Sequence, residues 1–215
     1  MAPLPLPLRN RLAELILEAF EPGEARETVC ALARIAGADG SAVEEADADR
    51  LLALGWFESL APGRVRLRGA HRAHGPDLAE RAARAASVVR DWRDRHGEDL
   101  VALLDRAAAL ANTGLFFEVH ELLEPVWFRA SEPERTGLQG LIQVAVAFHH
   151  LENGNREGAR SLLALGLRKL AEAGAALPLQ RTRWLDELRA TLASLSTGGG
   201  PPPIPRWPSV ASQAS

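Results

Sequence analysis

Apolar residues in the first quarter of the chain recur every three or four positions, which is the period of an amphipathic helix. Leu12, Leu15 and Ile16, for example, share one helical face. The pattern predicts three helices, over residues 8–20, 24–36 and 41–54. Ser41, with Glu44 three residues later, matches a capping box, so we expect Ser41 to cap the third helix.

After Gly55 the hydrophobic period shortens from that of a helix to that of a strand. Residues 56–58 and 64–68 flank the turn sequence Ala61-Pro62-Gly63, which predicts one short β-hairpin. Three helices followed by a hairpin resemble a winged helix-turn-helix. We therefore expect a small winged-helix-like domain over residues 1–75.

Long helical patterns separated by short turns dominate the rest of the chain. An Ala- and Arg-rich segment predicts a helix over 77–95, and we interpret residues 76–96 as a connector. Five further helices are expected, over residues 98–111, 115–129, 134–152, 155–173 and 179–195. Because short connections make neighbouring helices antiparallel, residues 97–196 should form a multi-helical bundle. The expected fold class is therefore mainly α.

The end of the chain differs in composition from the bundle. From Thr197 onward, Gly, Pro and Ser predominate, and three glycines run directly into three prolines. Such a composition buries too little apolar surface to fold by itself. We expect residues 197–215 to form a disordered Gly/Pro-rich tail, with Trp207 docking back onto the bundle.

Composition and charge exclude several classes of protein. Apolar residues make up 47% of the 215 and the net charge is −3, so the chain has no overall attraction for nucleic acid or anionic membranes. Its single cysteine, Cys30, excludes an intrachain disulfide. The chain has no apolar run of membrane-spanning length, and its proline-rich start lacks the features of a signal peptide. We expect a cytoplasmic protein that does not enter a membrane.

The third predicted helix would be the DNA-reading helix of a winged helix. It has one basic residue, Arg50, against four acidic ones: Glu44, Glu45, Asp47 and Asp49. DNA affinity depends on contacts of Lys and Arg with phosphates, so an acidic reader is repelled. The basic hairpin, with Arg64, Arg66 and Arg68, leaves weak contact with a DNA backbone open. We therefore disfavour DNA as a partner.

The helix expected over 115–129 carries apolar residues nearly all round it. Such a helix should be central, so its polar residues His120, Glu121 and Glu124 should be at least partly buried. Pro125 lacks a backbone donor and frees the carbonyl of Glu121, which predicts a kink beside these acidic groups.

The next helix adds a second set of polar side chains. Residues 136–151 contain no Asp, Glu, Lys or Arg. Gln139, Gln143 and His150 fall within about 40° of one another on a helix of 3.6 residues per turn, so they form a single polar stripe. An antiparallel hairpin would let this stripe face the one formed by His120, Glu121 and Glu124.

Three interpretations of this polar site remain open, because buried carboxylates must be paired, hydrogen-bonded or bound to a metal. The first is a structural hydrogen-bond network that fixes helix register. The second is a divalent metal site built from His120, Glu121, Glu124 and His150, since His and carboxylate at i and i+4 can chelate. The third is a metal-free ligand or catalytic pocket, with Glu121 or Glu124 as general base. The segment lacks both the zinc-protease HExxH pair and the paired ExxH motifs of di-iron bundles.

Several sequence blocks then point to one family. They are Phe117-Glu-Val-His-Glu-Leu-Leu-Glu-Pro-Val-Trp127, Leu138-Gln-Gly-Leu-Ile-Gln143, His150, Gly154-Asn155 and Gly158-Ala159. In this order and spacing the chain resembles the family of domain of unknown function 309, over about residues 101–170. The resemblance implies a multi-helical bundle and no established activity. It maps the family's characteristic polar residues onto Glu118, His120, Glu121, Glu124, Gln139, Gln143, His150 and Asn155.

We expect an uncharacterised helical binding or interaction module whose partner is a protein or a small molecule. The first alternative is a metal-dependent, hydrolytic enzyme. The second is a DNA-binding regulator that acts through the N-terminal domain, with the bundle as its sensor. The sequence does not fix the oligomeric state.

Overall fold

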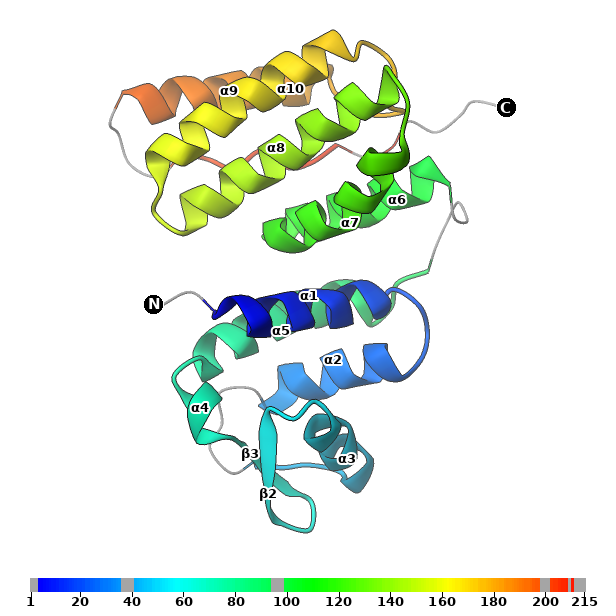
Figure 1. Cartoon of the computed structure of the whole chain (residues 1–215), viewed down its shortest axis with the longest axis vertical. Helices are drawn as coiled ribbons and strands as arrows, with labels where there is room; N and C mark the ends of the chain where they lie inside the picture. The colour runs from blue at the N-terminus through cyan, green and yellow to red at the C-terminus, as the bar shows by residue number, and fades with distance from the viewer. Residues whose placement is uncertain (1–3, 36–40, 94–98, 198–201, 209, 211–215) are drawn as a thin grey trace. The chain divides into compact units, whose positions relative to one another are not determined.

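The computed structural model describes residues 4–35, 41–93, 99–197, 202–208 and 210. The chain divides into two compact units, Met1–Arg93 and Asp94–Ser215, each with its own buried apolar residues. The fold is mainly α with a small antiparallel sheet in the N-terminal unit, as the sequence predicts (Figure 1). Within the described ranges, no helix is long and apolar enough to cross a bilayer.

The N-terminal unit has the element order expected of a winged helix. Its elements are α1 (Leu6–Glu18), α2 (Glu24–Ile35), β1 (Ser41–Ala42), α3 (Glu45–Ala53), β2 (Phe57–Ala61), β3 (Arg64–Leu67), α4 (Gly69–Arg72) and α5 (Gly75–Val89). β3 lies between β1 and β2 and is antiparallel to both. Fully buried Leu12, Leu32 and Phe57 contribute to the core. The helix that we predicted over 77–95 corresponds to α5, which begins two residues earlier and ends at Val89. Residues 94–95 of that prediction lie outside the described residues. α5 packs along α2.

The predicted cap of the third helix was wrong. Ser41 lies in β1, where it pairs in register with Val65 of β3. α3 begins only at Glu45, and Glu44 takes the N-cap position without a side-chain cap hydrogen bond. The backbone of Ser41 therefore belongs to the sheet and not to the helix. Its pairing partner Val65 lies 24 residues further along the chain, so a local capping pattern does not reveal it.

In the described residues of the C-terminal unit there are five long helices, as predicted. They are α6 (Leu100–Asn112), α7 (Phe116–Arg129), α8 (Glu134–Glu152), α9 (Arg156–Glu172) and α10 (Thr182–Ser196). Each helix packs against the next one along the chain. Gly114 and Gly154 have φ angles of +75° and +76° in the turns before α7 and α9. Glycine adopts this left-handed conformation without steric cost, so it ends α6 and α8 sharply.

α8 and α9 pack closely at two glycines. A Cβ atom on Gly140 would lie 2.8 Å from Cγ of Leu170 and 3.1 Å from the carbonyl oxygen of Gly166. A Cβ atom on Gly166 would in turn lie 2.9 Å from Cγ2 of Val144. The two backbones therefore approach one another at a distance that only glycine allows.

The disorder predicted for the tail does not extend to residues 202–208. Trp207 docks back as expected: it is 4% exposed, and its ring centroid lies 5.3 Å from that of Trp184 in α10. Burial of this large ring offsets the ordering of a segment that its Pro-rich composition marks as unfolded. Residues 198–201, 209 and 211–215 of the predicted tail lie outside the described residues.

Candidate functional site

One side of α7 carries polar and aromatic side chains that solvent reaches. We call this surface the α7 acidic face and define it as Phe117, His120, Glu121, Glu124 and Phe128. These positions fall within about 100° of arc on an α-helix. The side chains of the three polar residues are 26, 35 and 42% exposed in chain order, and Phe128 is 64% exposed. The predicted partial burial of the polar residues is thus observed, at a depth that leaves them accessible.

His120 lies between the two carboxylates of this face. Its Nδ1 atom is 2.9 Å from Oε1 of Glu121, and its Nε2 atom is 3.8 Å from Oε1 of Glu124. An ionised carboxylate only accepts hydrogen bonds, so this contact assigns the hydrogen to Nδ1, which donates the hydrogen bond to Oε1 of Glu121. All three side chains belong to α7. Their mutual contacts hold them in place on one helix and do not set the register between two.

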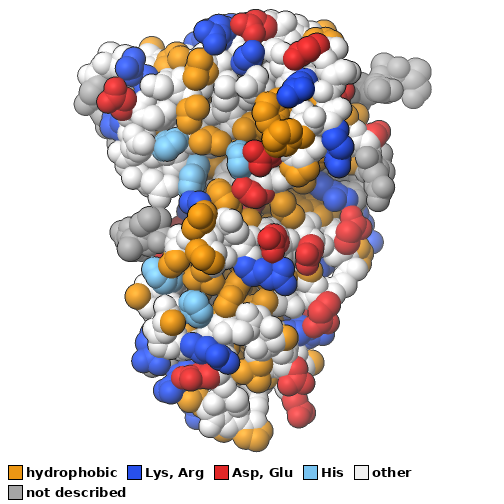
Figure 2. Space-filling model, viewed as in Figure 1, with side chains coloured by type: hydrophobic (Ala, Val, Ile, Leu, Met, Phe, Trp, Pro, Cys, Tyr) orange, Lys and Arg blue, Asp and Glu red, His pale blue; other side chains and the backbone are white. Residues whose placement is uncertain are grey.

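Phe117 connects this face to α8. Its ring centroid lies 6.3 Å from that of His120 and 5.8 Å from that of His149. The predicted polar stripe of this helix contained His150 and not His149. Figure 2 shows histidine side chains gathered on the viewed surface of the C-terminal unit, beside acidic and apolar ones. The doubled His149-His150 was the only sequence signal for this neighbour.

His150 instead belongs to the turn between α8 and α9. Its Nδ1 atom is 3.0 Å from Nδ2 of Asn155, which donates the hydrogen bond. Oδ1 of Asn155 accepts from the backbone N–H of Gly158 at 2.9 Å and thereby caps α9. A side-chain Cβ on Gly158 would collide with this cap at 2.6 Å. His150 and Asn155 thus have a structural explanation.

The two glutamines of the predicted second stripe are half-buried on α8. Oε1 of Gln143 is buried without a hydrogen-bond partner in the described part of the chain. No hydrogen bond joins Gln139 or Gln143 to a described residue of α7. The structure therefore brings His120, Glu121 and Glu124 together and does not link them to the glutamine stripe.

Glu118 was expected as a characteristic polar residue only from the family resemblance and not from the hydrophobic pattern. Its side chain is fully buried and makes a polar contact within the protein. Its neighbours in sequence are the half-buried Phe117 and the buried Val119. A glutamate beside apolar neighbours on a central helix was the available signal. Its burial places it in the core rather than on the α7 acidic face.

Donor atoms for a metal are limited. Among the described residues, no group of three or more His, Cys, Asp or Glu side chains is arranged to hold an ion. Of the four predicted metal ligands, His150 is hydrogen-bonded to Asn155 and not to the α7 groups. His120 and Glu124 remain as a pair with 3.8 Å between Nε2 and Oε1.

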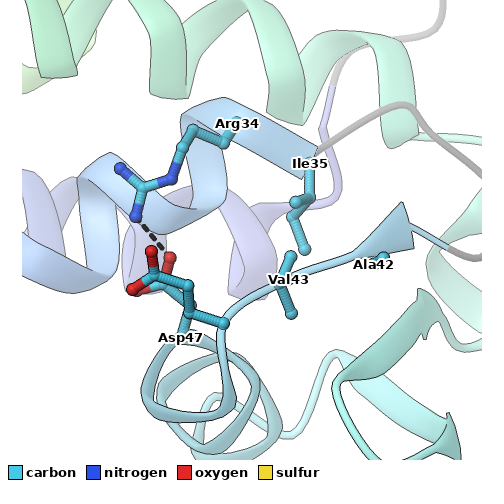
Figure 3. Close-up of a pocket in the computed structure, with 6 residues that line it drawn as sticks. Arg34, Ile35, Ala42, Val43 and Asp47 are labelled. Atoms are coloured by element: carbon cyan, nitrogen blue, oxygen red, sulfur yellow. Dashed lines mark hydrogen bonds and ion pairs between the residues drawn. The ribbon is translucent and has the colours of Figure 1, made fainter.

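The N-terminal unit has a separate cavity of about 660 Å³ where α2 meets β1 and α3 (Figure 3). Arg34 and Asp47 form an ion pair there, and Oδ1 of Asp47 also accepts from Nη1 of Arg50 at 3.2 Å. The hydrogen bond from Arg34 to Asp47 raises the pKa of the Arg34 guanidinium. Asp47 is 8% exposed, so its charge is buried and shared between two arginines. We call these contacts of Asp47 with Arg34 and Arg50 the Asp47 clamp, because the ion pair with Arg34 links α3 to α2.

The basic side chains of the hairpin are also engaged within the unit. Nε of Arg66 lies 2.6 Å from Oε1 of Glu58, and Nε of Arg68 donates to the carbonyl oxygen of Phe57 at 3.0 Å. Arg64 is not free either. The hairpin therefore offers less uncompensated positive charge than its sequence suggests.

Comparisons with known proteins place the α7 acidic face inside a family match. The family model described as "Domain of unknown function (DUF309)" matches residues 104–162, from α6 into α9. An uncharacterized protein of Aquifex aeolicus (strain VF5) is 35% identical over 71 residues, which cover 32% of this chain and 21% of that relative. No solved structure matches. Residues 104–162 therefore match the family of domain of unknown function 309, as the sequence blocks in the C-terminal half predicted.

Proposed function

We propose that the C-terminal unit is a binding module that recognises a basic segment of a partner protein through the α7 acidic face. The observation that carries this proposal is the accessible carboxylate pair. Glu121 and Glu124 are 35 and 42% exposed, and within the described chain their one ionic partner is His120. A neutral imidazole leaves two negative charges side by side, and a Lys or Arg side chain would compensate them.

Aromatic rings near the carboxylates suit the same kind of partner. Phe117 and Phe128 are eleven residues apart, so about 16 Å of helix separates them, with both carboxylates in between. The ring of Phe128 packs at 4.9 Å against that of Trp127, and the guanidinium of Arg135 lies 5.2 Å from the Trp127 ring centroid. This end of the face already holds one cation over an aromatic ring, which is a favourable contact. The fitting partner combines basic residues with apolar ones.

The other interpretations receive less support. A network that fixes helix register should join two helices, and the His120 contacts stay on α7. Binding of DNA through the N-terminal unit would need free cations. α3 is acidic, and Arg66 and Arg68 are engaged within the hairpin.

A divalent cation is the second candidate, on one specific observation. Nε2 of His120 faces Oε1 of Glu124 across 3.8 Å, and both are acceptors when the imidazole is neutral. A His nitrogen and a carboxylate oxygen at i and i+4 can both coordinate one metal ion, with water or a bound molecule in the other coordination positions. A metal-dependent hydrolytic activity would follow from such a site.

Peptide binding tests the leading proposal. The probe is a fluorescein-labelled peptide of alternating Arg and Leu, and a Glu/Leu peptide of equal length serves as its negative control. We expect the Glu121→Gln/Glu124→Gln variant to weaken binding at least tenfold, and Phe128→Ala to weaken it as well. Glu157→Gln/Glu172→Gln removes the same charge from exposed positions on α9 and should bind like the wild type. Equal affinity of the two double variants would overturn the proposal.

Elemental analysis decides between the two candidates. A stoichiometric divalent metal in the purified protein that disappears in both His120→Ala and Glu124→Gln would favour the cation site. In that case the wild type should bind the Arg/Leu peptide more tightly after treatment with a chelator. Metal-free protein that still binds the peptide fully would exclude the divalent cation site.

A further inference from the structure

The tail returns along α10 as an extended segment. We call residues 202–208 and 210 the C-terminal strap. Oγ1 of Thr191 donates to the carbonyl oxygen of Pro203 at 3.0 Å, Trp207 packs against Trp184, and Val210 forms an antiparallel bridge with Leu179. The contacts move toward the start of α10 as the strap proceeds, so the two run antiparallel.

Four prolines in residues 202–208 favour the extended backbone of a polyproline II helix. Pro202, Pro205 and Trp207 are buried, whereas Pro203, Ile204 and Arg206 are exposed. From Pro203 to Trp207 such a helix rises about 12 Å, at about 3.1 Å per residue. From Thr191 back to Trp184 an α-helix covers about 10.5 Å. The strap and α10 therefore cover similar distances between these two pairs of contacts.

Asn112, at the end of α6, holds the strap by its backbone. Its Oδ1 atom accepts from the N–H of Trp207 at 2.8 Å, and its Nδ2 atom donates to the carbonyl oxygen of the same residue at 3.4 Å. Trp184 and Trp207 are 3 and 4% exposed, and neither indole Nε1 has a hydrogen-bond partner among the described residues. The side chain of Trp207 is therefore held by shape and apolar burial, and its backbone by one bidentate amide.

We propose that α10, together with Asn112, forms a recognition site for peptides of the pattern Pro-x-x-Pro-x-Trp, and that the chain's own strap occupies this site in cis. The partner is a proline-rich, tryptophan-bearing segment of another protein, which competes with the strap. Proline-rich helices bind aromatic surfaces well because they are extended before binding and lose little entropy. The site lies almost entirely outside residues 104–162 and is independent of the α7 acidic face.

The test uses the full chain with Trp207→Ala and a labelled synthetic peptide of residues 202–210. We expect saturable binding to this variant and at least tenfold weaker binding to the wild type, because the tethered strap competes at an effective concentration in the millimolar range. Adding Asn112→Ala to Trp207→Ala should weaken binding about tenfold. A peptide with Ala in place of its Trp should not bind. If the Trp207→Ala variant is folded by circular dichroism and binds no peptide at millimolar concentration, the proposal fails.

Hydrogen exchange on the wild type gives an answer even if Trp207→Ala does not fold. Excess peptide should displace the strap and so accelerate exchange of the strap's own amides, such as the Trp207 amide that is hydrogen-bonded to Asn112. Amides within α10 should stay protected. Exchange of strap and α10 amides in a single step, unaffected by peptide, would show that the strap is an inseparable part of the bundle and would overturn the proposal.

Discussion

Asn155 shows how a single side chain can serve two neighbouring helices. Its Oδ1 atom caps the start of α9, and its Nδ2 atom donates to His150 near the end of α8. Gly158 leaves the space that this cap occupies. Three of the positions that suggested the family by sequence are therefore explained by one turn, without reference to a ligand.

We predict that Asn155→Ala lowers the free energy of unfolding by about 1–2 kcal/mol, because α9 loses its cap and His150 loses a donor. Urea denaturation of the purified protein measures the change. Asn155→Asp keeps an oxygen for the cap and removes the donor, so it should lie between Asn155→Ala and the wild type. Ser161→Ala, at an exposed position on α9, should change stability by less than about 0.5 kcal/mol. A loss no larger than that in Asn155→Ala would contradict this assignment.

At the scale of elements, the contact of α8 with α9 sets which way each face of α8 points. Gly140 faces α9. His149 is nine residues later, about half a turn away around the helix, and so it lies on the side where Phe117 of α7 approaches. Gln143 lies about 60° around the helix from Gly140 and His150 about 80°, so both lie on the flank of α8 between these two directions.

We predict that Gly140→Ala destabilises the protein by about 1–3 kcal/mol, since its Cβ would press on Leu170 and on the backbone of Gly166. Alanine is intrinsically better than glycine in a helix by about 1 kcal/mol, so a net loss would show that close packing prevails. Thermal unfolding measures the effect. Gly69→Ala, where an added Cβ meets nothing within 4 Å, is the matched control. An increase in melting temperature for Gly140→Ala would disprove the close contact.

Hydrophobic periodicity was sufficient to predict the helices and the hairpin, because each depends on residues close in the chain. It also grouped His120, Glu121 and Glu124 correctly on one helix. It could not show that Ser41 pairs with the distant Val65, or that α8 turns His149 rather than His150 toward Phe117. Those outcomes depend on contacts between elements, such as the glycine contact of α8 and α9. Local patterns do not encode them.

At the scale of the whole molecule, the chain consists of two units with separate cores. The Asp47 clamp belongs to the first, and the glycine contact of α8 and α9 belongs to the second. Each should therefore stabilise its own unit.

We predict that Asp47→Asn, which leaves Arg34 and Arg50 without their shared carboxylate, accelerates hydrogen exchange within residues 4–93 and leaves the second unit unchanged. Gly140→Ala should do the reverse. Mass spectrometry of peptic fragments locates the effect. Asp49→Asn, at an exposed position on α3, is the control for the first variant. Exchange that rises in both units for either variant would show that they unfold together.

The antiparallel course of the C-terminal strap has a mechanical consequence. A force that pulls on the end of the chain loads the bridge of Val210 first, then the Trp207 contacts, and then the hydrogen bond to Pro203. Contacts loaded one after another peel apart at low force, unlike contacts sheared all at once. In an optical trap the strap should therefore detach well before α10 unravels, and it should re-attach when the tension is released.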